Sequence, residues 1–182
     1  MTPELLLLAG RSGVGKTSVA YEVSAQLAAA RVAHVHLEGD ALSSVYPKPA
    51  DDPHGTRLTL ANLSAVWANY RSAGQHRLLY VNAVSVLEAD ALAAALGTRV
   101  SVRLVELTGE DATVAARLGA REIGGGLDQH LASSARVAGL LAAQAPSGTV
   151  RIATDRRGVP EIATDVVRAS GWATADGERS MG

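Results

Sequence analysis

The segment Gly10 to Thr17 reads G-R-S-G-V-G-K-T and matches the pattern G-x-x-x-x-G-K-[S/T]. It follows the apolar run Leu5 to Ala9 and precedes a helical pattern, so a strand, a loop and a helix are expected in that order. Three glycines in the loop allow backbone conformations closed to other residues, and they let amide N–H groups approach a polyphosphate. The pattern therefore predicts a nucleotide-binding loop.

Each residue type in the loop has a chemical reason to be there. Lys16 can reach the β- and γ-phosphates, and the Thr17 hydroxyl can ligate Mg²⁺. The following helix directs the positive end of its dipole at the same place. We expect the nucleotide to contact Gly10, Arg11, Ser12, Gly13, Val14, Gly15, Lys16, Thr17 and Ser18.

Length and charge limit the partners. A chain of 182 residues with 47% hydrophobic content suits one compact domain, expected over residues 1–172, followed by a disordered polar tail at 173–182. The net charge of -1 provides no basic field for nucleic acid or a membrane surface, which favours a diffusible small ligand. The absence of cysteine and of a basic or long apolar leader favours a cytoplasmic protein, as a monomer or a homodimer.

Apolar runs of strand length alternate with helix-length segments. Strands are expected at 5–9, 33–38, 78–83, 100–107 and 149–153, and helices at 16–30, 56–72, 86–95, 111–123, 128–143 and 160–170. This alternation predicts an α/β fold in which a parallel sheet has helices on both faces. The Pro-rich segment 43–55 and the glycines at 124–126 are expected to be loops.

The chain lacks the additional motifs that two classes of nucleotide hydrolase require. A guanine-reading N-K-x-D or T-K-x-D is absent, and the D-x-x-G match at 155–158 follows the last strand, where a switch loop cannot lie. The third strand ends in Asn82 and carries no acid that would hold Mg²⁺ and polarise water, as a motor-type ATPase requires. Hydrolysis is therefore disfavoured as the main task.

Asp40 is the candidate for the acceptor side of a transfer reaction. It ends the second expected strand, beside the phosphate loop, where it could take the proton of an acceptor hydroxyl or hold Mg²⁺ through water. A helix N-cap for Ala41 onward is the structural alternative. Glu38 could assist Asp40, or it could form an ion pair.

Arginines could stabilise a migrating phosphoryl group. Arg117 and Arg121 share one face of the expected helix 111–123, directly before the glycine hinge, and so predict a lid over about residues 112–136 that closes on the triphosphate. A solvated pair is the alternative. Arg57, after the Pro-rich loop, could bind the acceptor, and Arg136 is a weaker candidate.

Several residues have two possible roles. Trp67 and Tyr70 continue a helical apolar face with Leu60 and Leu63, and could instead line the acceptor pocket. Arg156, or its neighbour Arg157, could stack on the nucleotide base. His130 could touch phosphate, and His34 with His36 lacks a nearby third metal ligand.

In the order of these features the chain resembles the P-loop kinases of the nucleoside-monophosphate-kinase superfamily, in particular the small shikimate, gluconate, adenylylsulfate and antibiotic kinases. The resemblance implies a three-layer P-loop NTPase fold with sheet order 2-3-1-4-5 and a small lid. It also implies that Asp40 is a base or substrate ligand and that Arg117 contacts the transferred phosphate. The chain departs from shikimate kinases in having Asn82-Ala83-Val84 after the third strand, and it lacks the Asp-Gly-aromatic-Pro-Arg run of adenylate kinases.

We therefore expect an ATP- and Mg²⁺-dependent kinase that phosphorylates a hydroxyl of a small metabolite or antibiotic-like molecule. Lys16, Asp40, Arg117 and Arg121 would be its catalytic residues, and Asp40, Arg57, Trp67 and Tyr70 its acceptor contacts. A nucleoside or nucleoside-monophosphate kinase is the closest alternative. A non-catalytic nucleotide-binding regulator or weak ATPase is the alternative from another class.

Overall fold

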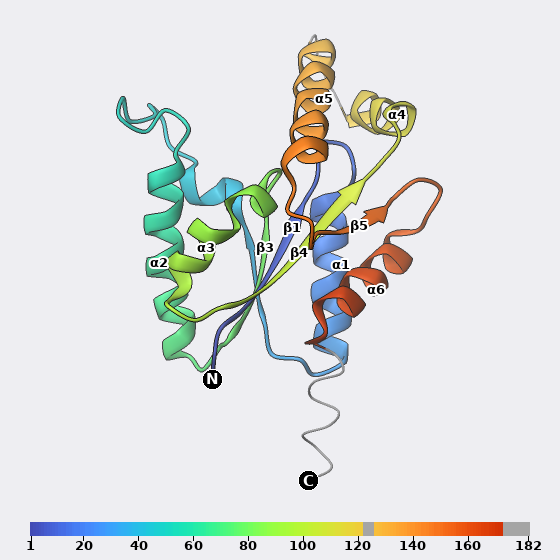
Figure 1. The fold of residues 1–182 in the computed structure, drawn as a ribbon. Helices are drawn as coiled ribbons and strands as arrows, with labels where there is room; N and C mark the ends of the chain where they lie inside the picture. Colours follow the sequence, from blue (N-terminus) through green and yellow to red (C-terminus); the bar gives the residue numbers. More distant parts are fainter. Residues whose placement is uncertain (122–125, 173–182) are drawn as a thin grey trace.

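The computed structural model describes residues 1–121 and 126–172, in which parallel strands alternate with helices (Figure 1). The strands are β1 Glu4–Ala9, β2 Val35–Glu38, β3 Arg77–Val81, β4 Ser101–Thr108 and β5 Val150–Ala153. The α-helices are α1 Lys16–Ala29, α2 Thr56–Ser72, α3 Ala89–Leu96, α4 Asp111–Arg121, α5 Leu127–Gln144 and α6 Val159–Ser170. Two short 3₁₀ helices, η1 Gly39–Ser43 and η2 Ser85–Glu88, follow β2 and β3.

The strands form one sheet in the order β2-β3-β1-β4-β5, and every neighbouring pair is parallel. This confirms the predicted order. The central strand β1 lies between β3 and β4, and its leucines from Leu5 to Leu8 are all fully buried. A strand buried on both faces needs a continuous apolar sequence, which explains why this segment does not alternate with polar residues.

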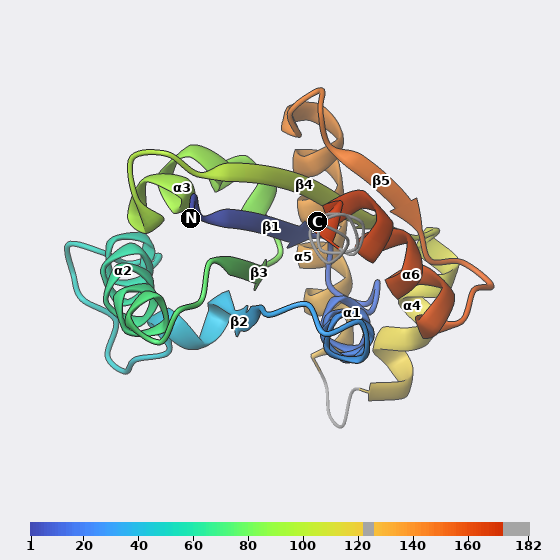
Figure 2. The same ribbon diagram turned by 90° about the horizontal axis from the view of Figure 1, so that it is seen from below.

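The helices cover both faces of the sheet, as Figure 2 shows from below. Leu6 and Leu8 point to the face covered by α1 and α6, in a core that includes Ile162 and Trp172. Leu5 and Leu7 point to the other face, where α2 and α3 pack. Since successive side chains of a strand point to opposite faces, one run of leucines supplies both cores.

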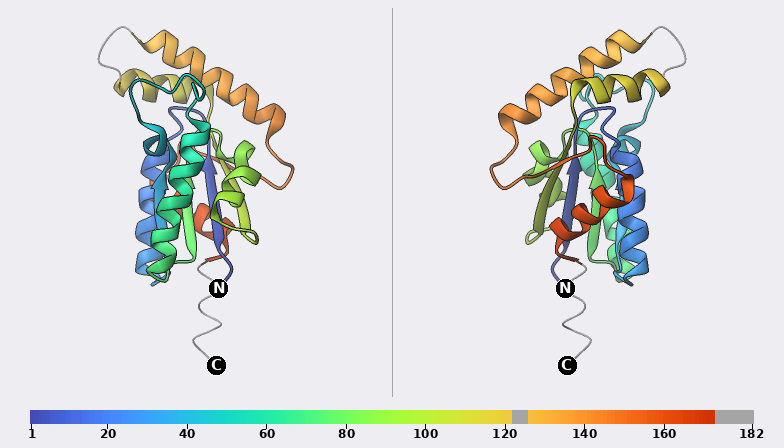
Figure 3. Two further views of the ribbon diagram at one scale, coloured as in Figure 1. Left: turned by 90° about the vertical axis from the view of Figure 1, so that its left-hand side faces the viewer. Right: turned by 90° about the vertical axis from the view of Figure 1, so that its right-hand side faces the viewer.

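The two helices α4 and α5 lie across the end of the sheet at which the β1–α1 loop emerges (Figures 1 and 3). They contain most of the segment predicted to form a lid, about 112–136. The predicted tail at 173–182 and the hinge residues Gly124 and Gly125 lie outside the described residues. Within the described part of the chain, no helix is long and apolar enough to cross a membrane.

The element boundaries differ from the predicted ones by a few residues. β2 begins at Val35 and not at Ala33; His34, just before it, has its ring bonded to Ser24 Oγ (2.7 Å) and to the carbonyl of Val32 (2.8 Å). The helix predicted at 86–95 divides into η2 and α3. The 3₁₀ turn η1, directly after β2, was not predicted, and it carries Asp40 in its first turn.

Candidate active site

The loop between β1 and α1 has the backbone that its glycines predict. Gly10, Gly13 and Gly15 have φ angles of 144°, 90° and 94°, all in the region that favours glycine. A Cβ on Gly10 would lie 2.6 Å from the carbonyl oxygen of Leu107 on β4, so the loop passes too close to the sheet for a side chain. The loop is therefore built in the form that a phosphate-binding loop requires.

A pocket of about 540 Å³ opens above this loop. Lys16 and Thr17 begin α1 and line the pocket, and the Nζ of Lys16 donates to the carbonyl of Arg11 across the loop at 3.3 Å. The pocket is lined by Ser12, Gly13, Gly15, Lys16, Thr17, Ser18, Asp40, Leu118, His130 and Ser133. The structure thus brings the loop, the Asp40 side chain and the lid helices around one space, which we call the phosphate pocket.

Asp40 also lines a second pocket of about 480 Å³ on its other side. This pocket, which we call the acceptor pocket, is enclosed by Asp40, Ser43, His54, Thr56, Thr59, Leu60, Tyr80, Asn82, Val84, Leu87, Glu88, Ala91 and Leu92. Asp40 is the residue that both linings share. Its carboxylate is therefore at the junction of the two spaces.

Asn82 holds Asp40 at this junction. Its Nδ2 donates to Oδ1 of Asp40 at 2.9 Å, and its own Oδ1 accepts from the amide of Val84 at 3.2 Å. Residues 38 and 81 are paired in the ladder of β2 and β3, so the residues that follow these two strands emerge side by side. In the sequence, Asn82 is notable only because it stands where a motor-type ATPase carries an acidic residue and because it departs from the pattern of shikimate kinases. Its place directly after a strand next to β2 was the signal that could have identified it.

Two further acceptor-pocket residues were missed because they lie in apolar sequence. Tyr80 is fully buried in β3, and its hydroxyl has no hydrogen-bond partner within the described residues. Burial, with a smaller contribution from the charges of Glu88 and Asp40, raises the pKa of Tyr80. Burial also raises the pKa of Glu88, which ends η2. Nothing in the local sequence distinguishes these two residues from core and surface positions.

The three predicted acceptor contacts on α2 lie elsewhere. Trp67 is 2% exposed and belongs to the core, together with Leu63, so the predicted packing on a helical face is confirmed and the alternative contact with the acceptor is wrong. Tyr70 lies in the last turn of α2, four helical turns from Thr56 at the pocket, and is also corrected. Arg57 is exposed, is not in the pocket lining, and pairs with Asp51 at 2.6 Å. The helical spacing of Trp67 and Leu63 therefore reflects their packing in the core.

Helices α4 and α5 are tied to the β1–α1 loop by Arg11 and Ser134. The buried Arg11 guanidinium pairs with Asp111 at the start of α4, and its Nε donates to Ser134 Oγ on α5 at 2.9 Å. Ser134 in turn donates to the carbonyl of Ser12 at 2.8 Å. The side chain of Arg11 therefore contacts α4 and α5 and is not part of the phosphate-pocket lining.

Arg117 lies beside the loop but is not part of the phosphate-pocket lining. Its guanidinium donates to the carbonyl of Val14 at 3.4 Å and to Oγ1 and the carbonyl of Thr154 at 3.1 and 3.0 Å. It thus joins α4 to the loop that follows β5. The helix ends at Arg121, whose side chain lies outside the described residues.

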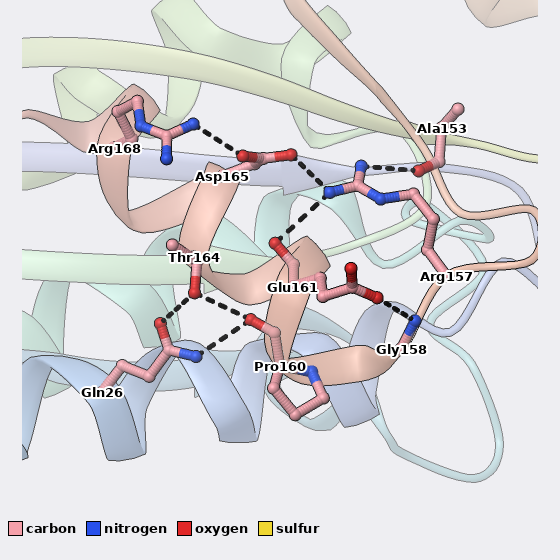
Figure 4. A network of polar contacts seen from close by, with 9 residues as sticks. All are labelled: Gln26, Ala153, Arg157, Gly158, Pro160, Glu161, Thr164, Asp165 and Arg168. Carbon is pink, nitrogen blue, oxygen red and sulfur yellow. Dashed lines mark hydrogen bonds and ion pairs between the residues drawn. The ribbon is translucent and has the colours of Figure 1, made fainter.

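The loop after β5 is held by a polar network at the start of α6 (Figure 4). Arg157 donates to Asp165 at 2.6 Å and to the carbonyl of Ala153 at 3.2 Å, while Arg168 also pairs with Asp165. The guanidinium of Arg157 is therefore bound within this network and, in this structure, is not free to stack on a nucleotide base. Its neighbour Arg156 is exposed and has a left-handed backbone, with φ of 55°.

The remaining candidates also have defined places. His130 lines the phosphate pocket, and Arg136 is exposed on α5. Oε1 of Glu38 lies 3.4 Å from Nε2 of His36, and the two form an ion pair only when the His36 ring is protonated, a form that burial disfavours by lowering the pKa of His36. The described residues contain no cluster of three or more His, Asp or Glu that could hold a metal. Thr17 and Asp40 nevertheless place two oxygen ligands on one pocket, which suits Mg²⁺ shared with phosphates and water.

Neither a protein-family model nor a curated protein sequence matches the chain. Solved structures do. A gluconokinase from Sinorhizobium meliloti matches with a TM-score of 0.61 and 18% identity over 99% of this chain and 98% of that one. A sugar kinase from Janibacter sp. matches with a TM-score of 0.62 and 18% identity over 96% of this chain and 98% of that one. The tunicamycin resistance protein of Deinococcus radiodurans matches with a TM-score of 0.59 and 20% identity over 94% of this chain and 96% of that one. The chain therefore has the three-layer P-loop NTPase fold of these structures.

Proposed function

We propose that the protein is an ATP-dependent kinase that transfers the γ-phosphoryl group to a hydroxyl of a small molecule. The observation that carries this proposal is the position of Asp40, which lines both the phosphate pocket and the acceptor pocket. A hydroxyl in the second pocket would meet a triphosphate in the first beside a carboxylate that can accept its proton. The fold neighbours that are gluconokinase and sugar kinase support the same reaction class.

In this mechanism the loop amides and Lys16 hold the β- and γ-phosphates. Asp40 accepts the hydroxyl proton as the acceptor oxygen bonds to the γ-phosphorus, and the bond to the bridging oxygen breaks, releasing ADP. Asn82 fixes one oxygen of Asp40 and leaves the other for the proton. Mg²⁺ bound by Thr17, and by Asp40 through water, would neutralise charge on the phosphate oxygens.

The lid would complete the site. We assign Arg117 and Arg121 to neutralising the charge that develops on the phosphoryl group, as arginines on a closing segment can do. In the present structure the guanidinium of Arg117 is bound to Thr154, so it would have to exchange this partner to reach the γ-phosphate. Arg156, exposed on the loop after β5, remains our candidate for stacking on the base. We expect the enzyme in the cytoplasm, as a monomer or homodimer.

No observation favours a nucleoside-monophosphate kinase. Such an enzyme must bind the acceptor's phosphate, and the lining of the acceptor pocket, as far as the described residues form it, contains neither Lys nor Arg. Trp67 is buried and cannot stack on a second base. A regulator or weak ATPase would use the phosphate pocket without the acceptor pocket, so the presence of both favours transfer.

The test is a coupled ADP-release assay with ATP and Mg²⁺ against sugars, sugar acids, nucleosides and antibiotic-like alcohols. ADP release that depends on an acceptor, and a phosphorylated acceptor found by mass spectrometry, would support the kinase. Tight ATP binding without acceptor-dependent ADP release across the whole panel would refute it in favour of the regulator.

A further inference from the structure

The acceptor pocket has an unusual balance of charge. Asp40 and Glu88 supply two carboxylates to its lining, and His54 is the one basic side chain that the lining includes among the described residues. Neither of the nearest Lys or Arg side chains is part of the lining: Arg57 pairs with Asp51, and the Nζ of Lys48 donates to the carbonyl of the lining residue Ser43 at 2.6 Å. A negatively charged acceptor would therefore enter this pocket against two carboxylates, with His54 as the one basic side chain in the lining among the described residues.

The pocket also contains a buried polar group without a partner. The Tyr80 hydroxyl is buried and has no hydrogen-bond partner among the described residues, and buried polar groups are rarely left unpaired unless a ligand or water completes them. Glu88 is half-buried, and its side chain makes no capping hydrogen bond to α3, the helix that it precedes. Both groups line the same space as Asp40, so a ligand that reaches Asp40 can reach them.

Apart from Asn82, which is bound to Asp40, the rest of the lining is apolar or carries hydroxyls. Leu60, Val84, Leu87, Ala91 and Leu92 form the apolar part, and Ser43, Thr56 and Thr59 add hydroxyl groups. This mixture suits a ring or chain whose carbon faces are apolar and whose edge carries hydroxyls. The volume of about 480 Å³ is in the range of small-ligand pockets, which run from about 300 to 1,000 Å³.

We propose that the acceptor is a polyhydroxylated molecule without negative charge, a sugar, cyclitol or amino sugar, that donates a hydroxyl or ammonium hydrogen to Glu88 and accepts one from Tyr80. This inference rests on the proposed kinase function and names the substrate class of the same site. Glu88 and Tyr80 are then specificity-determining residues, and Asp40 meets the reacting hydroxyl. An acceptor with an amine uses the charge of Glu88 more fully than one with a hydroxyl.

The test compares acceptors that share a skeleton and differ in charge. Glucose, glucosamine and gluconate form one such set, an inositol with its amino and acid derivatives forms a second, and a nucleoside with its 5′-monophosphate forms a third. Acceptor binding is measured by calorimetry with Mg²⁺-ADP present, and transfer by ADP release. Within at least one set the neutral or amino member should bind and react with a KM at least tenfold below that of the anionic member.

Variants at Glu88 separate recognition from catalysis. Glu88→Gln should raise the KM of an amine-bearing acceptor by about tenfold to a hundredfold, the size of a charged hydrogen bond, with a small change in kcat. Tyr80→Phe should raise the KM of all acceptors a few-fold. Asp90→Asn, on the exposed start of α3 and outside the pocket lining, is the matched control and should change neither constant. Unchanged ATP affinity and thermal unfolding would show that the variants fold.

The outcomes distinguish the two proposals. Transfer only to the anionic members would overturn the acceptor class and leave the kinase standing. Binding of the neutral or amino members without any transfer would support the acceptor class and refute the kinase. A Glu88→Gln enzyme with an unchanged acceptor KM, or no binding by any uncharged or amino member, would overturn the inference.

Discussion

At the scale of single residues, the junction between the two pockets depends on the contact between Asp40 and Asn82. The Asp40→Asn enzyme should retain ATP affinity, because nucleotide binding rests on the loop and Lys16, while its kcat for transfer falls by about 10²- to 10⁴-fold. Steady-state assays with calorimetric ATP titration measure both effects. Asn82→Ala, which keeps the Asp40 carboxylate but removes the hydrogen bond that positions it, should lower kcat by less than Asp40→Asn does. Undiminished kcat in Asp40→Asn would exclude it as the base.

The position before Asp40 has room only for a glycine, Gly39, because the backbone there passes close to Tyr80. A Cβ there would lie 2.3 Å from the hydroxyl of the buried Tyr80, which cannot move aside without disturbing the core. We expect Gly39→Ala to lower the free energy of unfolding by about 1–3 kcal/mol, as overpacked cores do. Gly139→Ala on α5, where a Cβ meets no atom within 4 Å, is the control and should raise it slightly. Urea unfolding measures both; equal stability of the two variants would contradict the close approach.

His36 should make stability depend on pH. Its burial lowers its pKa in the folded chain, an effect that Glu38 only partly offsets. As the pH falls below about 6.5, the unfolded chain takes up a proton on this residue before the folded chain does, so stability declines toward acid and is constant above this range. The slope of unfolding free energy between pH 7.5 and 5.5 should therefore be smaller in His36→Gln. An identical slope would show that His36 titrates alike in both states.

At the scale of elements, the hydrogen bonds of Ser134 join α5 to the phosphate loop. Ser134→Ala removes the acceptor of Arg11 Nε and the donor to Ser12, both in a buried place, and should cost about 1–3 kcal/mol of stability. Because these bonds position the loop, the KM for ATP should rise as well. Gln129→Ala, exposed on the same helix, is the control. Lost stability with an unchanged KM for ATP would mean that the tie does not position the loop.

The elements themselves were largely predictable, and the acceptor pocket was not. β1 and the loop after it follow from an apolar run and a glycine pattern, which are local signals. The pocket is assembled from η1, α2, β3, η2, α3 and the loops beside them, and the role of its polar residues becomes visible only when the sheet order brings Asp40 and Asn82 together. Trp67 shows the opposite case, because its helical spacing with Leu63 favours packing, which the structure confirms, and the alternative contact with the acceptor had no support of its own in the sequence.

At the scale of the whole molecule, the parallel sheet places the ends of β1, β2 and β3 at one edge, and α4 with α5 covers that edge (Figure 3). The phosphate loop, Asp40 and Asn82 all follow strands that end there. Two core clusters, one on each face, fix these strands relative to one another. This packing sets the placement of the two pockets relative to one another, which the proposed in-line transfer between them would require.

In the proposed kinase the phosphoryl group passes from ATP in the phosphate pocket to a hydroxyl in the acceptor pocket. This transfer can be followed by ³¹P NMR of the protein with ATP, Mg²⁺ and the acceptors of the matched sets. A kinase should give a phosphate monoester signal that grows in step with ADP, and that is lost in Lys16→Ala and in Asp40→Asn. Growth of inorganic phosphate instead, at a rate that no acceptor changes, would contradict it.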